Sequence, residues 1–157
     1  MKILLIQIEK TTDSYLTEGV KIYTERLKNY ISFSTETISM AKNIRQKPFD
    51  EQRRAEALEI QKLLDPSDFL VCMDEHGKQF TSIQFADFLN KRMVSGCKRV
   101  VFLIGGPFGI DKTIIEKSSY VLSLSNMTFS HQMIRLFFCE QLYRGFSILK
   151  NEKYHHE

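Results

Sequence analysis

The stretch from Arg99 to Arg135 reads RVVFLIGGPFGIDKTIIEKSSYVLSLSNMTFSHQMIR, and it decides the fold class of the chain. Its first part, 100–104, is a continuous apolar run, which is typical of a strand buried on both faces of a parallel sheet. The glycine- and proline-rich segment 105–109 predicts a sharp turn with accessible backbone amides. Asp111 is placed to cap a short helix, and a second strand is expected over 120–124.

The segments that follow these two strands locate the candidate site. The first is the turn at 105–109, and the second is the polar loop 125–130, which leads into a long amphipathic helix. In an open parallel α/β sheet, ligands bind at loops beyond the carboxyl ends of the strands. We therefore expect a binding site between these two loops.

The rest of the chain alternates between strand and helix patterns. Strands are expected at 3–8, 34–39 and 69–74, helices at 13–29, 50–64, 81–93 and 131–149, a polar basic connection at 41–47 and a turn at 75–78. Thr81, with Gln84 three residues later, forms a capping box at the start of one helix. This alternation predicts one α/β domain over residues 1–157, with a mainly parallel sheet flanked by helices.

Composition excludes several classes of protein. The 157 residues are 43% hydrophobic and carry a net charge of +3. No apolar run approaches the roughly 20 residues of a membrane span, and the N-terminus lacks a signal-peptide cleavage site. The three cysteines are odd in number and have no metal-type spacing, which favours reduced thiols. We expect a folded cytoplasmic protein with no membrane partner and no metal.

Basic residues gather in two places along the chain. One cluster holds Lys42, Arg45 and Lys47, and the other holds Lys91, Arg92, Lys98 and Arg99. Each cluster is either a solvated surface or a contact for the phosphate backbone of a nucleic acid. A homodimer would double the net positive charge.

The last helix carries an apolar stripe, which consists of Ile134, Phe137, Phe138, Gln141, Leu142, Gly145, Phe146 and Leu149. The stripe packs against the sheet or forms the seam of a homodimer. In a dimer, a second copy of the helix could approach closely at Gly145.

Several familiar sites are absent from the sequence. The GGPFG turn is neither a dinucleotide-binding fingerprint nor a phosphate-binding loop. No serine lies in a nucleophile elbow, and the four histidines match no metal-binding spacing. An enzyme built on this chain would therefore depend on a bound cosubstrate, on positioning, and on one proton acceptor.

Four side chains near the expected site or at the end of the chain have open roles. His131 either caps the last helix or faces a substrate, and Arg135 either holds a phosphate or base edge or forms a surface ion pair. Tyr154 and His155 belong to a tail that is either frayed or closes over a pocket, where it would supply a hydroxyl and an imidazole.

Four segments together resemble a known family: LIGGPFG (103–109), LSLSNMTFSHQMIR (122–135), EQLYRGFSI (140–148) and the final Tyr154-His155. They are similar to the small SPOUT-class methyltransferases of the ribosomal RNA large subunit methyltransferase H family. The resemblance covers nearly the whole chain and is strongest after Phe69. It implies an α/β knot, in which a deep C-terminal trefoil knot lies beside the cofactor. It also implies a homodimer that acts on the assembled ribosome.

The resemblance further implies a reaction and a site. The cofactor is S-adenosyl-L-methionine, and the target is N3 of pseudouridine 1915 in helix 69 of the 23S ribosomal RNA. The cofactor-binding residues would be Met73, Gly105, Leu124, Ser125, Asn126, Met127, Thr128 and Phe129. The catalytic residues would be His155 as proton acceptor or orienting group, Tyr154 as a stacking or hydrogen-bonding group, and Arg135 on the RNA. An apolar, polarisable surround suits an adenine ring.

Two positions depart from the family pattern. Ser130 stands where the family usually has proline before the histidine, and His156 stands where it often has arginine or lysine. Two other functions compete with this one: a ribosome-associated α/β binding module without catalysis, and a SPOUT methyltransferase that acts on transfer RNA. The absence of an appended RNA-binding domain disfavours transfer RNA.

Overall fold

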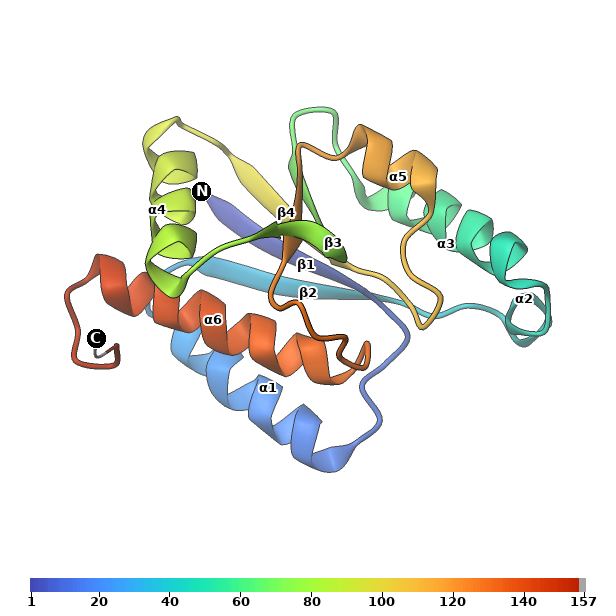
Figure 1. The fold of residues 1–157 in the computed structure, drawn as a ribbon, viewed down its shortest axis with the longest axis horizontal. Coiled ribbons are helices and arrows are strands. Elements are labelled where there is room, and N and C mark those ends of the chain that lie inside the picture. Colours follow the sequence, from blue (N-terminus) through green and yellow to red (C-terminus); the bar gives the residue numbers. More distant parts are fainter. Residues whose placement is uncertain (156–157) are drawn as a thin grey trace.

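A five-stranded parallel sheet forms the centre of the computed structural model, which describes residues 1–155 (Figure 1). In sequence order the strands are β1 (Lys2–Ile8), β2 (Ser32–Ile38), β3 (Phe69–Gln79), β4 (Arg99–Ile104) and β5 (Tyr120–Ser123), and across the sheet they lie in the order β2-β1-β4-β3-β5. Every paired strand is parallel to its neighbour. This confirms the predicted α/β fold with a parallel sheet.

Helices cover both faces of the sheet (Figure 1). The helices are α1 (Ser14–Leu27), α2 (Lys42–Arg45), α3 (Phe49–Leu63), α4 (Ser82–Val94), α5 (Lys112–Lys117) and α6 (Met133–Leu149). Alternate side chains of β1 point to opposite faces: Ile3 and Leu5 pack with α1, α4 and α6, whereas Leu4 and Ile6 pack with α3 and α5. The central strand β4 is therefore buried on both sides, as its continuous apolar run predicts.

The predicted helix starts at Thr81 and Asp111 are confirmed. The Thr81 hydroxyl accepts a hydrogen bond from the Gln84 backbone N–H at 3.2 Å, and the Gln84 side chain accepts one from the Thr81 N–H at 2.9 Å. The Asp111 carboxylate accepts bonds from the Thr113 N–H at 2.9 Å and the Thr113 hydroxyl at 2.6 Å. Both caps satisfy N–H groups that the first helical turn leaves without partners.

The turn predicted at 75–78 is wrong, because β3 continues through it as far as Gln79. The strand bends there, so that Leu122 of β5 pairs with Met73 before the bend and with Lys78 after it. A Cβ atom on Gly77 would lie 2.6 Å from the Leu122 carbonyl carbon. Only glycine allows this approach. The trefoil knot that the resemblance implies stays a prediction.

The structure corrects two further predictions. The connection 41–47 contains the single helical turn α2, and the Gln52 side chain donates hydrogen bonds to the Arg45 and Lys47 carbonyl oxygens at 3.2 and 2.7 Å. The close approach expected at Gly145 is made to α4 of the same chain, because a Cβ there would lie 3.1 Å from Leu89 Cδ1. Gly145 is therefore part of the α4–α6 packing and not of a seam between two copies.

Candidate functional site

The two loops that follow β4 and β5 converge on a cleft of about 300 Å³, which lies at the bend of β3 and the carboxyl ends of β4 and β5. This volume is at the lower end of the range for small-molecule sites, which is about 300–1,000 Å³. All of the predicted cofactor residues except Asn126 line the cleft: Met73, Gly105, Leu124, Ser125, Met127, Thr128 and Phe129. Asn126 lies in the same loop and is exposed.

The first wall of the cleft is the turn after β4. The Gly109 N–H donates to the Gly106 carbonyl oxygen at 3.1 Å, and Gly109 has a φ of +81°, which favours glycine. A Cβ on Gly105 would lie 2.8 Å from Ile110 Cγ1 and 3.0 Å from the Gly109 carbonyl oxygen. The backbone of the turn therefore folds back so tightly on Gly105 that any larger residue must displace it.

The second wall is the loop 124–130, and short hydrogen bonds hold its shape. The Ser123 hydroxyl donates to the Ser125 carbonyl oxygen at 2.7 Å, and the Ser125 hydroxyl accepts from the Met127 N–H at 2.9 Å. The Thr128 hydroxyl donates to the Glu75 carboxylate at 2.6 Å, which ties the loop to the bend of β3. Ser130, which replaces the family's usual proline, accepts a bond from the Met133 N–H at 3.1 Å at the start of α6.

The lining of the cleft is apolar at its base and acidic at one edge. Ile104, Leu122 and Ile134 supply apolar surface, and Asp74 and Glu75 supply carboxylates where β3 bends. The hydroxyls of Ser125 and Thr128, the imidazole of His131 and backbone groups of the two loops add further polar atoms. Such a site suits a planar apolar group together with a positively charged group.

His131 lines the cleft and does not cap α6, because the helix begins at Met133. Burial lowers the pKa of His131, and the positive charge of Arg135 lowers it further. The imidazole is therefore neutral near neutral pH and can accept a proton or a hydrogen bond. From the sequence, His131 either caps the last helix or faces a substrate. Its position immediately after the second loop already indicated that it could line the cleft.

Arg135 is buried inside the protein, whereas a contact with RNA requires an exposed side chain. Its side chain is 0% exposed, and it does not line the cleft. Its guanidinium donates to the Ile8 carbonyl oxygen at 2.5 Å and to the Thr11 hydroxyl at 2.8 Å. Burial lowers its pKa, which the nearby Glu9 partly opposes. The prediction of an RNA-binding Arg135 is therefore corrected: the residue fixes the end of β1 to α6.

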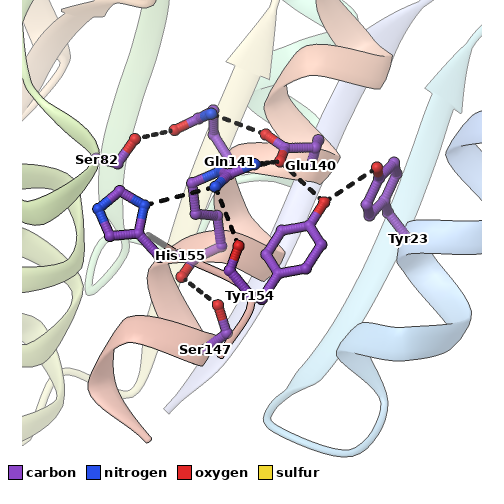
Figure 2. A network of polar contacts seen from close by, with 8 residues as sticks. Tyr23, Ser82, Glu140, Gln141, Ser147, Tyr154 and His155 are labelled. Atoms are coloured by element: carbon purple, nitrogen blue, oxygen red, sulfur yellow. Dashed lines mark hydrogen bonds and ion pairs between the residues drawn. The ribbon is translucent and has the colours of Figure 1, made fainter. Parts of the chain in front are cut away.

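Tyr154 and His155 dock beside the middle of α6 (Figure 2). Neither residue lines the cleft of its own chain. The Tyr154 hydroxyl donates to Glu140 at 3.1 Å and lies 3.2 Å from the Tyr23 hydroxyl. Its ring packs against the Arg144 guanidinium at 4.7 Å, and His155 Nδ1 lies 3.5 Å from Arg144 Nη1. The tail is thus ordered and not frayed as far as residue 155. His156 lies outside the described residues.

A buried carboxylate supports the outside of the first loop. Glu56 of α3 is only 7% exposed, and its Oε1 atom would lie 3.1 Å from a Cβ on Gly106. The pKa of Glu56 is raised to about 7, chiefly by burial and also by the charge of Glu9, and the charge of Arg53 opposes both effects. The ionised form of Glu56 is therefore costly in the folded protein.

We expect the free energy of unfolding to fall as the pH rises from about 4.5 to about 7 and to level off above that, because over this range the folded state keeps a proton that the unfolded state has lost. Glu56→Gln removes this dependence. Relative to the wild type, its free energy of unfolding should increase by about 2 kcal/mol between about pH 5 and about pH 8.5. Urea denaturation at the two pH values measures this change, and a pH-independent difference would contradict it.

Within residues 1–155, no group of His, Cys, Asp or Glu side chains has the arrangement of a metal site. Cys72, Cys97 and Cys139 form no disulfide. None of the helices in this range is long and apolar enough to cross a membrane.

The fold and the cleft define an α/β protein with a small-molecule site at one edge of a parallel sheet. The sequence profile described as "Predicted SPOUT methyltransferase" matches residues 1–155, so the chain belongs to the SPOUT methyltransferase family. A solved structure described as a probable methylase family protein from Haemophilus influenzae has a similar fold, with a TM-score of 0.55 and 12% identity. That similarity covers 99% of this chain and 70% of the other.

Particular relatives are far more similar in sequence. The protein named ribosomal RNA large subunit methyltransferase H from Parabacteroides distasonis is 48% identical over 157 residues, which cover 100% of both chains. The protein of the same name from Flavobacterium psychrophilum has the same identity and coverage. The one from Christiangramia forsetii is 47% identical and covers 99% of each chain. The resemblance of the sequence to this family is confirmed.

Proposed function

We propose that the protein uses S-adenosyl-L-methionine to methylate N3 of pseudouridine 1915, in helix 69 of the 23S ribosomal RNA, within the assembled ribosome. The observation that carries this proposal is the cleft, in which the two loops of the family motifs meet at the carboxyl edge of the sheet. The full-length identity to proteins named ribosomal RNA large subunit methyltransferase H supports the choice of substrate.

The residues of the cleft fit this cofactor. Leu124, Met127 and Phe129 offer an apolar surround for adenine, and the tight turn at Gly105 leaves backbone groups accessible to polar atoms. The acidic pair Asp74 and Glu75 matches a ligand that carries positive charge. When bound, the cofactor supplies an electrophilic methyl group.

The chain's own part in the reaction is to orient the base and to remove a proton. N3 of pseudouridine carries an imide proton, which must leave before or during methylation. We assign His155 as its acceptor and Tyr154 as the group that stacks on or hydrogen-bonds to the base. In the docked position, an Arg144 N–H faces His155 Nδ1, so proton acceptance requires a different position of the tail. Positioning supplies the rest of the acceleration.

The docked tail lies away from the cleft of its own chain, which supports a homodimer in which one copy's tail serves the other's cleft. Large apolar side chains are exposed around the start of α6: Met127 is 73% exposed and Phe137 is 39% exposed, and Phe137 packs on Phe129 at 4.8 Å. These residues lie beside the cleft and provide an apolar surface for a second copy.

The proposed function is tested by incubating the purified protein with methyl-labelled S-adenosylmethionine and ribosomes, followed by mapping of the labelled nucleotide. We expect label on N3 of a pseudouridine of the 23S RNA. Label only on transfer RNA would overturn the choice of substrate. Cofactor binding without any transfer would favour the non-catalytic binding module.

We expect His155→Ala to slow methyl transfer at least about tenfold, the lower range for loss of a proton acceptor, and to leave the affinity for the cofactor unchanged. Rapid-quench kinetics and calorimetry measure the two quantities. An unchanged rate would remove His155 from the mechanism.

A mixture of His155→Ala and Gly105→Ala chains shows whether the tail acts in the cleft of its own chain or in the cleft of a second copy. If the tail serves a second copy, mixed dimers contain one cleft and one tail that are both intact, and activity returns. If each tail serves its own cleft, mixing restores nothing.

A further inference from the structure

A pair of stacked aromatic rings, one exposed and one half-buried, lies at the turn that forms the first wall of the cleft. Neither ring belongs to a predicted site residue. Phe49, at the start of α3, is 60% exposed, and its ring stacks on that of Phe108 with centroids 3.9 Å apart and planes 21° apart. Phe108 is at the tip of the turn whose other residues, from Gly105 to Gly109, line the cleft. The pair therefore lies next to the turn that forms the first wall of the cleft.

The pair is fixed in position by contacts beneath it. The Arg53 guanidinium donates to the Phe108 carbonyl oxygen at 3.3 Å, and the Gly109 N–H closes the turn onto the Gly106 carbonyl oxygen at 3.1 Å. On the other side, Gln52 binds the carbonyl oxygens of Arg45 and Lys47 and holds the segment before α3 against the helix. A rigid aromatic surface loses little conformational entropy on binding.

The surroundings of the two rings are basic. Lys42, Arg45, Lys47 and Arg54 are exposed on α2, α3 and the segment between them, and Arg53 and Lys112 lie nearby. Some of this charge is balanced, because Lys47 pairs with Glu51 at 3.0 Å and Arg53 pairs with Asp50. The first of the two basic clusters in the sequence, Lys42, Arg45 and Lys47, is therefore exposed near the rings, with Lys47 partly balanced by Glu51.

Aromatic rings exposed among cations are the combination that binds unpaired nucleotides, because bases stack on the rings while phosphates pair with the cations. We propose that Phe49 and Phe108 form a stacking platform for an unpaired base of the RNA substrate, beside the methylated nucleotide, with Arg45, Lys47 and Arg54 on the adjoining phosphates. This proposal rests on the proposed function, since its ligand is the same RNA, and it adds an RNA-binding surface outside the cleft.

Ribosome binding tests the platform separately from catalysis. We expect Phe49→Ala and Phe108→Ala each to raise the Kd for ribosomes about tenfold, within the range for the loss of one stacked base. Phe49→Trp should keep the wild-type Kd. The affinity for S-adenosylmethionine should not change in any of these variants. Leu58→Ala is the matched control, because Leu58 is 62% exposed on the same helix but lies away from the rim; its Kd should equal that of the wild type.

Salt dependence and cross-linking complete the test. Arg54→Gln should reduce the slope of log Kd against log salt concentration by about 0.7, the value for one phosphate on a single strand, whereas Lys62→Gln should not change it. A photoreactive benzoylphenylalanine at position 49 should cross-link to ribosomal RNA. Cross-linking to a ribosomal protein alone, or a wild-type Kd for both alanine variants, would overturn the platform. If the wild type binds ribosomes through these residues but transfers no methyl group, the platform stands and the proposed function fails.

Discussion

Gly105→Ala is expected to raise the Kd for S-adenosylmethionine at least about tenfold, which corresponds to about 1.4 kcal/mol. The added methyl group would lie 2.8 Å from Ile110 Cγ1 and 3.0 Å from the carbonyl oxygen of Gly109. The second contact is with backbone, so the turn itself must move, and with it the wall of the cleft. Calorimetric titration with the cofactor measures the change.

The matched control for this variant is Gly19→Ala, which introduces a methyl group at a similarly short distance but away from the cleft. The nearest atom there is Leu136 Cδ1 at 2.9 Å, at the end of a flexible side chain that can turn aside. Cofactor affinity should stay at the wild-type value in this variant. Equal affinities of wild type and Gly105→Ala would mean that the turn after β4 does not contact the cofactor.

Arg135→Ala is expected to lower the free energy of unfolding by about 3 kcal/mol, because it leaves a cavity and removes the donors to the Ile8 carbonyl and the Thr11 hydroxyl. For a domain of this size, the melting temperature should fall by about 6–12 °C. Thermal denaturation measures the change. Lys62→Ala is the control, since Lys62 forms an exposed pair with Glu59, and it should cost less than about 0.5 kcal/mol. A melting temperature of Arg135→Ala equal to that of the control would exclude the structural role.

Much of the fold follows from local patterns in the sequence. The apolar runs of β1 and β4, the capping box at Thr81 and the cap at Asp111 all appear where their patterns indicate. The extension of β3 was not predicted, because residues 75–78 are polar and include a glycine, which is typical of a turn. Lys78 and Gln79 pair with β5 beyond the bend, and such a long-range contact has no local pattern.

The candidate site could be predicted in part. The two loops were identified because each follows an apolar strand, and they do line one cleft. Arg135 was misjudged because a charged residue is usually exposed, and its acceptors on Ile8 and Thr11 lie more than a hundred residues away in the chain. The docking of Tyr154 on Tyr23 and Glu140 likewise depends on tertiary structure, as does the burial of Glu56 beneath the first loop.

The stacking of Phe49 on Phe108 could not be predicted from the sequence either. The two residues lie in segments that the sequence treats separately, the start of one helix and the glycine-rich turn. Their partnership is set by the packing of α3 beneath the turn, through Arg53 and Glu56. The tertiary structure thus brings Phe49 and Phe108 together next to the basic cluster of Lys42, Arg45 and Lys47.

The most direct test of the proposed cofactor site is the crystal structure of the protein soaked with S-adenosylmethionine. We expect electron density for the cofactor in the cleft, between the turn at Gly105 and the loop 124–130. An empty cleft at saturating cofactor concentration, or density for the cofactor elsewhere on the molecule, would contradict it.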